Sequence, residues 1–196
     1  MPHPIEIVRE LFQLAPDEEE SILSLMEELN FKRGDRIEAR SFMRGYGLYV
    51  VKGMVRVFYV SNGREHTFSF ALDGEYVSPS HLLLGDPNSV MCVEFLEPTD
   101  VISLSHQLLD ENIDAILPRR AREVTRFIAA TMMEHMKYLE ERVILLQTAN
   151  ASQRYHWMEQ RYPRVLERAT IVQVASFLGI TKETIYRIRS NKYTAK

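Results

Sequence analysis

The sequence has a single cysteine, Cys92, which excludes an internal disulfide and any iron–sulfur or zinc cluster built on cysteine. It also lacks an apolar run of about eighteen residues, so we expect no membrane-spanning helix. The first residues, Met-Pro-His-Pro-Ile-Glu, do not have the pattern of a signal peptide. These absences together predict a cytoplasmic protein, whose 196 residues suffice for one large domain or two small ones.

Catalytic motifs are missing as well. Barrel enzymes that bind a metal use a His-x-His pair with further ligands on neighbouring strands, but here His66, His81 and His106 are scattered along the chain. Neither a Gly-x-Ser-x-Gly motif nor a P-loop occurs. We therefore predict that the protein is not an enzyme and has no metal site.

The net charge of −3 conceals a strong asymmetry along the chain. Residues 1–117 hold 9 Lys and Arg against 20 Asp and Glu, whereas residues 151–196 hold 9 against 3. Residues 118–150 are nearly balanced, with 6 against 4. Positive charge gathered on one segment is the electrostatic footprint of phosphate binding, so we expect residues 151–196 to contact nucleic acid.

Residues 171–190 have the pattern of two short helices separated by Gly179. A glycine in a left-handed conformation can end the first helix, and Thr181 is placed to cap the second by accepting from free backbone N–H groups. Two helices joined by a Gly-containing turn form a helix-turn-helix motif. The apolar residues that would pack the two helices together recur at three- and four-residue steps: Val174, Leu178, Ile185 and Ile188.

The second of these helices would turn a polar face outward. Such a face can enter a major groove, where Arg or Lys addresses guanine and Glu accepts from cytosine. The alternative is an ordinary surface helix in which Glu183 and Arg187 form a solvated pair one turn apart. The combination of apolar spacing, glycine and threonine cap favours DNA binding. The candidate DNA-binding residues are Thr181, Lys182, Glu183, Tyr186 and Arg187.

From Phe31 onward, short segments rich in Val, Tyr and Phe alternate with turns. Asn62-Gly63 is a hairpin signal, because both central positions of a primed turn need positive φ. Many short strands at this spacing predict a small antiparallel barrel or roll. The expected strands cover residues 48–51, 54–60, 66–71, 90–96 and 101–105, and the expected flanking helices cover residues 5–14, 21–29, 79–85 and 106–117.

The segment Asp73-Gly74-Glu75 leads into the expected short helix at residues 79–85 and is a candidate ligand cradle. Backbone N–H groups at a helix N-terminus can hold an anion there, while Glu75 accepts from a hydroxyl group. Alternatively, the loop only packs across the mouth of the barrel. The residues alone favour neither reading.

The longest helical pattern follows Pro118, and no Gly or Pro occurs from residue 121 to residue 150. About thirty residues of helix span roughly 45 Å, more than a small barrel needs for cover, so we expect a partner helix and a homodimer. The apolar stripe is too broad for a strict coiled-coil seam, because Met132, Leu139, Val143 and Leu146 widen it. The predicted interface residues are Val124, Phe127, Ile128, Thr131, His135 and Tyr138.

This order of elements resembles the Crp/Fnr superfamily of transcription regulators over essentially the whole chain. The local matches are Val51-Lys-Gly-Met-Val-Arg56, Asp73-Gly-Glu75 and residues 174–189. The resemblance implies an α+β fold. It would comprise a small antiparallel β-roll of the cyclic-nucleotide-binding type (residues 1–117), a long dimerisation helix (118–150) and a helix-turn-helix domain (151–196). It also implies a homodimer that binds double-stranded DNA, regulates transcription and contacts RNA polymerase.

Within that superfamily the sequence is most similar to short members with a degenerate effector pocket. Cyclic-nucleotide binders hold the cyclic phosphate with an Arg that falls here at or beside Ser89, and no Lys or Arg lies between Glu75 and Asp100. Without that charge-assisted contact, cyclic AMP is disfavoured. Gly74, Glu75 and Ser89 stay candidates for the pocket of an unknown small-molecule effector, and no cofactor is expected.

Two alternatives to this effector-sensing regulator stay open. One is a regulator or protein-interaction module that keeps the barrel without binding an effector. The other is a regulator that does respond to a cyclic nucleotide, through a non-standard contact to the phosphate.

Overall fold

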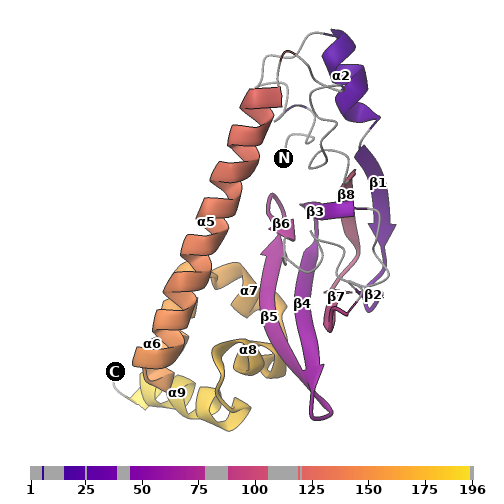
Figure 1. Ribbon diagram of the computed structural model, residues 1–196. Helices are drawn as coiled ribbons and strands as arrows, with labels where there is room; N and C mark the ends of the chain where they lie inside the picture. Colours follow the sequence, from indigo (N-terminus) through magenta and orange to yellow (C-terminus); the bar gives the residue numbers. More distant parts are fainter. Residues whose placement is uncertain are drawn as a thin grey trace.

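The computed structural model describes residues 6, 16–24, 26–38, 45–77, 88–105, 119 and 121–194. The helices predicted for residues 79–85 and 106–117, and for residues 5–14 apart from Glu6, lie outside the described residues. Figure 1 shows a β-roll with a long helix running beside it and a group of short helices at one end. The predicted α+β class, with a roll, a long helix and a C-terminal helical domain, is confirmed.

The β-roll consists of two four-stranded sheets in which all neighbouring strands are antiparallel. The first sheet has the order β1-β8-β3-β6, with β1 (Met26–Phe31), β8 (Thr99–Ser105), β3 (Gly45–Lys52) and β6 (Tyr76–Val77). The second has the order β2-β7-β4-β5, with β2 (Arg36–Glu38), β7 (Met91–Phe95), β4 (Met54–Ser61) and β5 (Arg64–Leu72). Alternate residues of both sheets fill one core, which includes Leu48, Val50, Val55, Val57, Val93, Phe95 and Val101.

The five predicted strands are all present with slightly shifted ends. The hairpin signal is also confirmed, since Asn62 and Gly63 join β4 to β5 with φ values of 51° and 70°. The turn between β3 and β4 requires Gly53, whose φ is 121° and where a Cβ atom would lie 2.4 Å from Oγ1 of Thr99. Turn chemistry therefore fixes where these strands begin and end.

The prediction of a helix over residues 21–29 is wrong in its second half. Helix α2 spans Pro16–Leu23, and the chain then forms β1, in which Leu29 pairs with Val101 of β8. Leu29 and Phe31 pack against the core of the roll, and Phe31 stacks on Phe95 with ring centroids 3.8 Å apart. Burial against a distant strand therefore overrides the helical spacing of the apolar residues.

The long helix is confirmed as α5 (Ala121–Thr148). It is followed by α6 (Ala151–Arg161), α7 (Pro163–Arg168), α8 (Ile171–Leu178) and α9 (Lys182–Thr194). Capping boxes of Asn150 with Gln153 and of Thr170 with Gln173 begin α6 and α8. Helix α7 has Pro163 in its first turn, where a proline is tolerated because its missing N–H group would have no partner within the helix. None of the helices in the described ranges is long and apolar enough to cross a membrane.

A second apolar core joins the roll to the C-terminal helices. Met54 and Leu72 of the roll are buried together with Met158 of α6 and with Phe177 and Leu178 of α8. Helix α8 packs along β5, which is one of the two edge strands of its sheet. The helix-turn-helix is therefore docked on the roll.

Candidate nucleic-acid interface

Helices α8 and α9 form the predicted helix-turn-helix. Gly179 has left-handed dihedrals of 63° and 37°, and its N–H group donates back to the carbonyls of Ala175 and Ser176. The Thr184 N–H group donates to Oγ1 of Thr181 at 3.2 Å, so the predicted cap of α9 is present. Ile185 is fully buried in the second core. The buried side of α9 is thus fixed, which determines the face that it presents to solvent.

That outward face carries the predicted DNA-binding residues. Lys182, Glu183 and Arg187 are exposed, as is Thr181, and Tyr186 has 55% of its surface exposed. Glu183 forms its ion pair with Lys182, at 3.9 Å, and not with Arg187 one turn further on. Within the described part of the chain, Arg187 has no ion-pair partner. Its guanidinium group is therefore open to an acceptor outside the molecule.

Two other arginines of the basic segment point inward instead. Arg189 donates from Nε to the Tyr155 hydroxyl at 2.7 Å and lies over the same ring. Arg154 donates to the carbonyl of Leu146 in α5 at 2.7 Å and to that of Leu178 in α8 at 3.2 Å. A cation at two helix C-termini complements both helix dipoles. Both side chains are therefore structural.

Two further arginines, on α7, bind acidic residues of the roll. Arg164 pairs with Asp73, and Arg168 donates from Nε to Oε2 of Glu97 at 3.2 Å. Arg168 also lies 3.4 Å from Asp73, whose other oxygen accepts from the Gly53 N–H group. Part of the charge asymmetry along the chain is thus neutralised inside the molecule.

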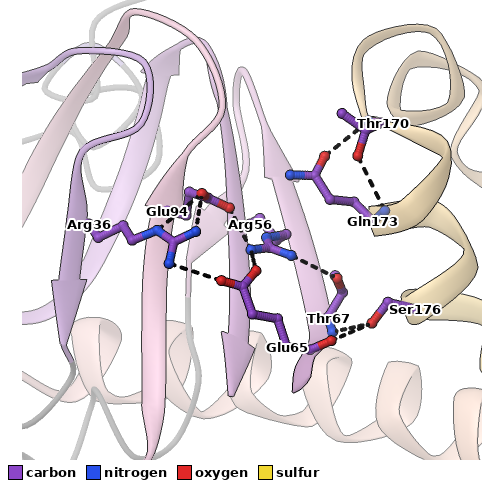
Figure 2. A network of polar contacts seen from close by, with 8 residues as sticks. All are labelled: Arg36, Arg56, Glu65, Thr67, Glu94, Thr170, Gln173 and Ser176. Carbon is purple, nitrogen blue, oxygen red and sulfur yellow. Dashed lines mark hydrogen bonds and ion pairs between the residues drawn. The ribbon is translucent and has the colours of Figure 1, made fainter. Parts of the chain in front are cut away.

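Four charged side chains form a network on the second sheet (Figure 2). Arg56 lies 2.6 Å from Glu94 and also pairs with Glu65, while Arg36 contacts Glu94 at 2.8 Å and Glu65 at 2.9 Å. Both guanidinium groups lie over the ring of Phe58. Burial would raise the pKa of Glu65, but the hydrogen bonds and charges of Arg56 and Arg36 outweigh it and lower that pKa below its ordinary value.

Sequence reasoning missed this network, because its members come from four different strands. Arg36 and Glu94 are 58 positions apart. Charged residues within otherwise apolar strands were the signal that could have pointed to it.

The network continues from the roll to α8, as Figure 2 shows. Arg56 approaches Oγ1 of Thr67 at 3.4 Å, and the Thr67 N–H group donates to Oγ of Ser176 at 2.8 Å. The Ser176 hydroxyl in turn donates to the carbonyl of Glu65 at 3.2 Å. One serine of the helix-turn-helix therefore occupies both an N–H group and a carbonyl on the open edge of β5.

The candidate effector residues all bond backbone groups of the roll. Glu75 accepts from the Leu72 N–H group at 2.9 Å, and Gly74 donates to a neighbouring strand. Burial raises the pKa of the Glu75 carboxyl, and the hydrogen bond from Leu72 opposes this only in part. Ser89 is buried and accepts from the Met91 N–H group at 3.1 Å. Arg161 of α6 is a cation close enough to lower the pKa of Glu75 in part, whereas position 89, where cyclic-nucleotide binders have an Arg, holds a serine.

Helix α5 has one side that is covered by its own chain. Val124 is buried, and Thr131, His135 and Tyr138 are half-buried. Burial raises the pKa of Tyr138 and lowers that of His135. The side chains of Phe127 and Ile128 lie outside the described residues. That the six predicted interface residues contact a second copy of the chain stays a prediction.

A different row of α5 side chains is exposed to solvent except at Leu139, which is half-buried. Its spacing alternates between three and four residues along the helix, and most of its members are large and apolar. This row, called the α5 seam below, consists of Ala129, Met132, Met136, Leu139, Val143 and Leu146.

Solved structures of other proteins share this fold, although no model of a protein family and no curated protein sequence matches the chain. FixK2 from Bradyrhizobium japonicum is 23% identical with a TM-score of 0.68, covering 87% of this chain and 85% of its own. CLP from Xanthomonas campestris, a c-di-GMP responsive global regulator, is 14% identical with a TM-score of 0.66, covering 92% and 93%.

A transcriptional regulator of the Crp/Fnr family from Eubacterium rectale is 16% identical with a TM-score of 0.64, covering 93% of this chain and 85% of its own. These identities are low, whereas the shared topology extends over most of each chain. The chain therefore has the fold of the Crp/Fnr transcription regulators.

Proposed function

We propose that the protein is a transcription regulator that binds double-stranded DNA as a homodimer and reads the major groove with α9. The observation that carries this proposal is the helix-turn-helix, whose second helix buries Ile185 and exposes Lys182, Tyr186 and Arg187. A single α-helix fits the major groove, which is about 12 Å wide. The likeness to Crp/Fnr regulators supports the same conclusion. Contact with RNA polymerase stays a prediction.

Dimerisation through the α5 seam follows from its spacing. Steps of three and four residues are those of the a and d positions of a coiled coil, and apolar side chains at these positions pack against a second helix. The seam covers 18 residues from Ala129 to Leu146, or roughly 27 Å of helix. Val124 of the predicted interface is buried within its own chain, whereas most residues of the seam are exposed, which supports the seam as the face that meets a partner.

Selection of binding sites from random-sequence DNA tests the function. We expect enrichment of a palindrome whose half-sites are separated by about one helical turn, 34–36 Å, because a two-fold dimer presents two copies of α9. The double variant Tyr186→Ala/Arg187→Ala should lose this enrichment. Its matched control, Arg122→Ala/Arg126→Ala, removes two exposed arginines of α5 and should select the same sequence as the unaltered protein. The absence of any enriched sequence would refute the proposal.

For the roll, we propose a sensor of an unknown small molecule that is not cyclic AMP. The pocket candidates Gly74, Glu75 and Ser89 offer acceptors and backbone groups but no cation for a phosphate. Losing such a charged hydrogen bond costs roughly 1.5–3 kcal/mol, or about ten- to a hundredfold in affinity. Calorimetric titration with cyclic AMP should give no binding in the micromolar range, and a micromolar dissociation constant would contradict this.

A further inference from the structure

Arg142 of α5 is a buried cation without an acidic partner in the described part of the chain. Only 9% of its surface is exposed, and burial lowers the pKa of its guanidinium group. A buried charge is costly unless other groups satisfy it. In this protein those groups include two carbonyls and two aromatic rings from different parts of the fold, together with the Tyr138 side chain of the same helix.

The contacts of Arg142 join three elements. Its Nη2 atom donates to the carbonyl of Phe177 in α8 at 3.1 Å and approaches the carbonyl of Thr67 in β5 at 3.4 Å. Its guanidinium carbon lies 4.1 Å from the centre of the Phe177 ring and 5.7 Å from that of Phe68. The long helix, the edge of the roll and the helix-turn-helix therefore meet at one side chain.

The end of α8 depends on such outside donors. The last four carbonyls of an α-helix have no partner within the helix. The turn that follows α8 satisfies those of Ala175 and Ser176. Arg142 satisfies the carbonyl of Phe177, and Arg154 satisfies that of Leu178. The direction in which α8 ends, and from which α9 starts, is thus set partly by α5.

We propose that Arg142 is a positioning residue. It docks the helix-turn-helix on β5 and thereby fixes the direction of α9 relative to α5. This inference rests on the proposed function. Helix α9, with 13 residues, is about 20 Å long. A tilt of about 10° would move its far end by about 3.5 Å, close to one base-pair step of 3.4 Å. A loosened joint would therefore change the half-site spacing that the dimer accepts.

The test compares Arg142→Met with Arg126→Met, a matched substitution at an exposed position of the same helix. The first readout is amide hydrogen exchange at Thr67 in the DNA-free protein, because Ser176 protects this N–H group only while α8 is docked. We expect exchange in Arg142→Met to be about tenfold faster or more, and exchange in Arg126→Met to be unchanged. Equal protection in both variants would overturn the proposal.

The second readout is spacing preference, measured on operators whose half-sites are moved apart or together by one or two base pairs. Arg142→Met should accept several spacings with similar affinity while still binding an isolated half-site as the unaltered protein does. If Arg142 were purely structural, its replacement would lower the affinity for the full operator and the affinity for an isolated half-site together. That outcome would also overturn the proposal.

Arg142→Lys covers the case in which the Met variant does not fold. It keeps the charge but lacks the planar group that covers the Phe177 ring, so exchange at Thr67 should again be faster than in the unaltered protein. Unchanged exchange there would refute the proposal. The two proposals can fail separately, because hydrogen exchange is measured without DNA. If the unaltered protein does not bind DNA, the proposed function is refuted, but the exchange at Thr67 still tests whether Arg142 docks the helix-turn-helix.

Discussion

At the scale of single residues, the directions of the arginines decide how the basic segment can act. Arg154 and Arg189 point into the protein, and Arg164 and Arg168 bind carboxylates of the roll. Arg187 lies on the outward face of α9 and has no ion-pair partner within the described ranges. Net charge alone would give all five the same role, whereas in the structure only Arg187 of these five is free for the base reading proposed above.

Replacing Arg187 by Ala should reduce specific DNA affinity by about 1–3 kcal/mol and relax the preference at one base pair per half-site. The reason is that the guanidinium fork matches the acceptor pair of guanine in the major groove. Binding-site selection with the variant measures this directly. If the preferred sequence stays the same, Arg187 only anchors a phosphate, and α9 is not the reader.

The ion-pair network on the second sheet should make stability depend on pH. Glu65→Gln removes one of the two carboxylates that contact buried Arg56, so it should lower the free energy of unfolding by about 1–2 kcal/mol at pH 7. The side chain of Glu65 is 37% exposed, and solvent screens part of the effect.

The sign of the pH dependence follows from the lowered pKa of Glu65 in the folded protein. Its contribution is fully present above the unfolded-state pKa, about 4.3, and is lost as the pH falls through the lower folded-state pKa. Urea unfolding should therefore show the difference between the two proteins at pH 7 and a much smaller one near about pH 3. An equal difference at both pH values would mean that the charge of Glu65 is not involved.

At the scale of elements, α5 illustrates what a sequence pattern leaves undecided. Its apolar residues form two interleaved rows, and both repeat at three- and four-residue steps. The described residues of one row are buried or half-buried within the protein's own chain, whereas most of the α5 seam is exposed. Which of the two rows is buried depends on where the roll lies against α5, and the sequence of the helix alone does not determine this.

Val143→Asp should convert the dimer into a monomer at concentrations of tens of micromolar, because an unpaired carboxylate would be buried in the seam. The adjacent Ile144 provides the control. The two side chains are similarly exposed, at 52% and 59%, but Ile144 is not part of the seam. Sedimentation velocity should show a dimer for Ile144→Asp and a monomer for Val143→Asp, and the reverse result would place the interface on the side of α5 that carries Ile144.

The elements that the sequence predicted well are those defined by local chemistry. Gly179 and Thr181 mark the turn and the cap of the helix-turn-helix within a few residues, and Asn62-Gly63 marks a hairpin. In contrast, β1 was assigned to a helix because its partner β8 follows about seventy residues later. The network from Arg36 to Glu94 and the docking of Ser176 on Thr67 were not predictable for the same reason, since each depends on strands and helices that meet only in the folded protein.

At the scale of the whole molecule, roll and helix-turn-helix share one apolar core and are not two independent units. Met54 and Leu72 of the roll are buried against Met158 and Phe177 of the C-terminal helices. Ion pairs from Arg164 and Arg168 of α7 to Asp73 and Glu97 also join the C-terminal helices to the roll. We therefore expect the two parts to unfold together.

The single tryptophan makes this expectation measurable, since Trp157 lies on α6 and packs against the shared core. Its fluorescence and the far-UV circular dichroism should report the same unfolding transition in denaturant. Leu72→Ala, a change in the roll, should shift both signals equally and cost about 2–5 kcal/mol. A fluorescence transition at lower denaturant than the circular dichroism would show that the C-terminal helices unfold on their own.

The docking of α8 has a further consequence for the roll. Strand β5 lies at the edge of its sheet, and an uncovered edge offers free N–H and C=O groups to any other extended chain. Ser176 and Arg142 occupy such groups at Thr67 and Glu65. The helix-turn-helix domain thus also acts as the cover that keeps two rolls from pairing edge to edge, and a molecule whose helix-turn-helix has detached is exposed to aggregation until it docks again.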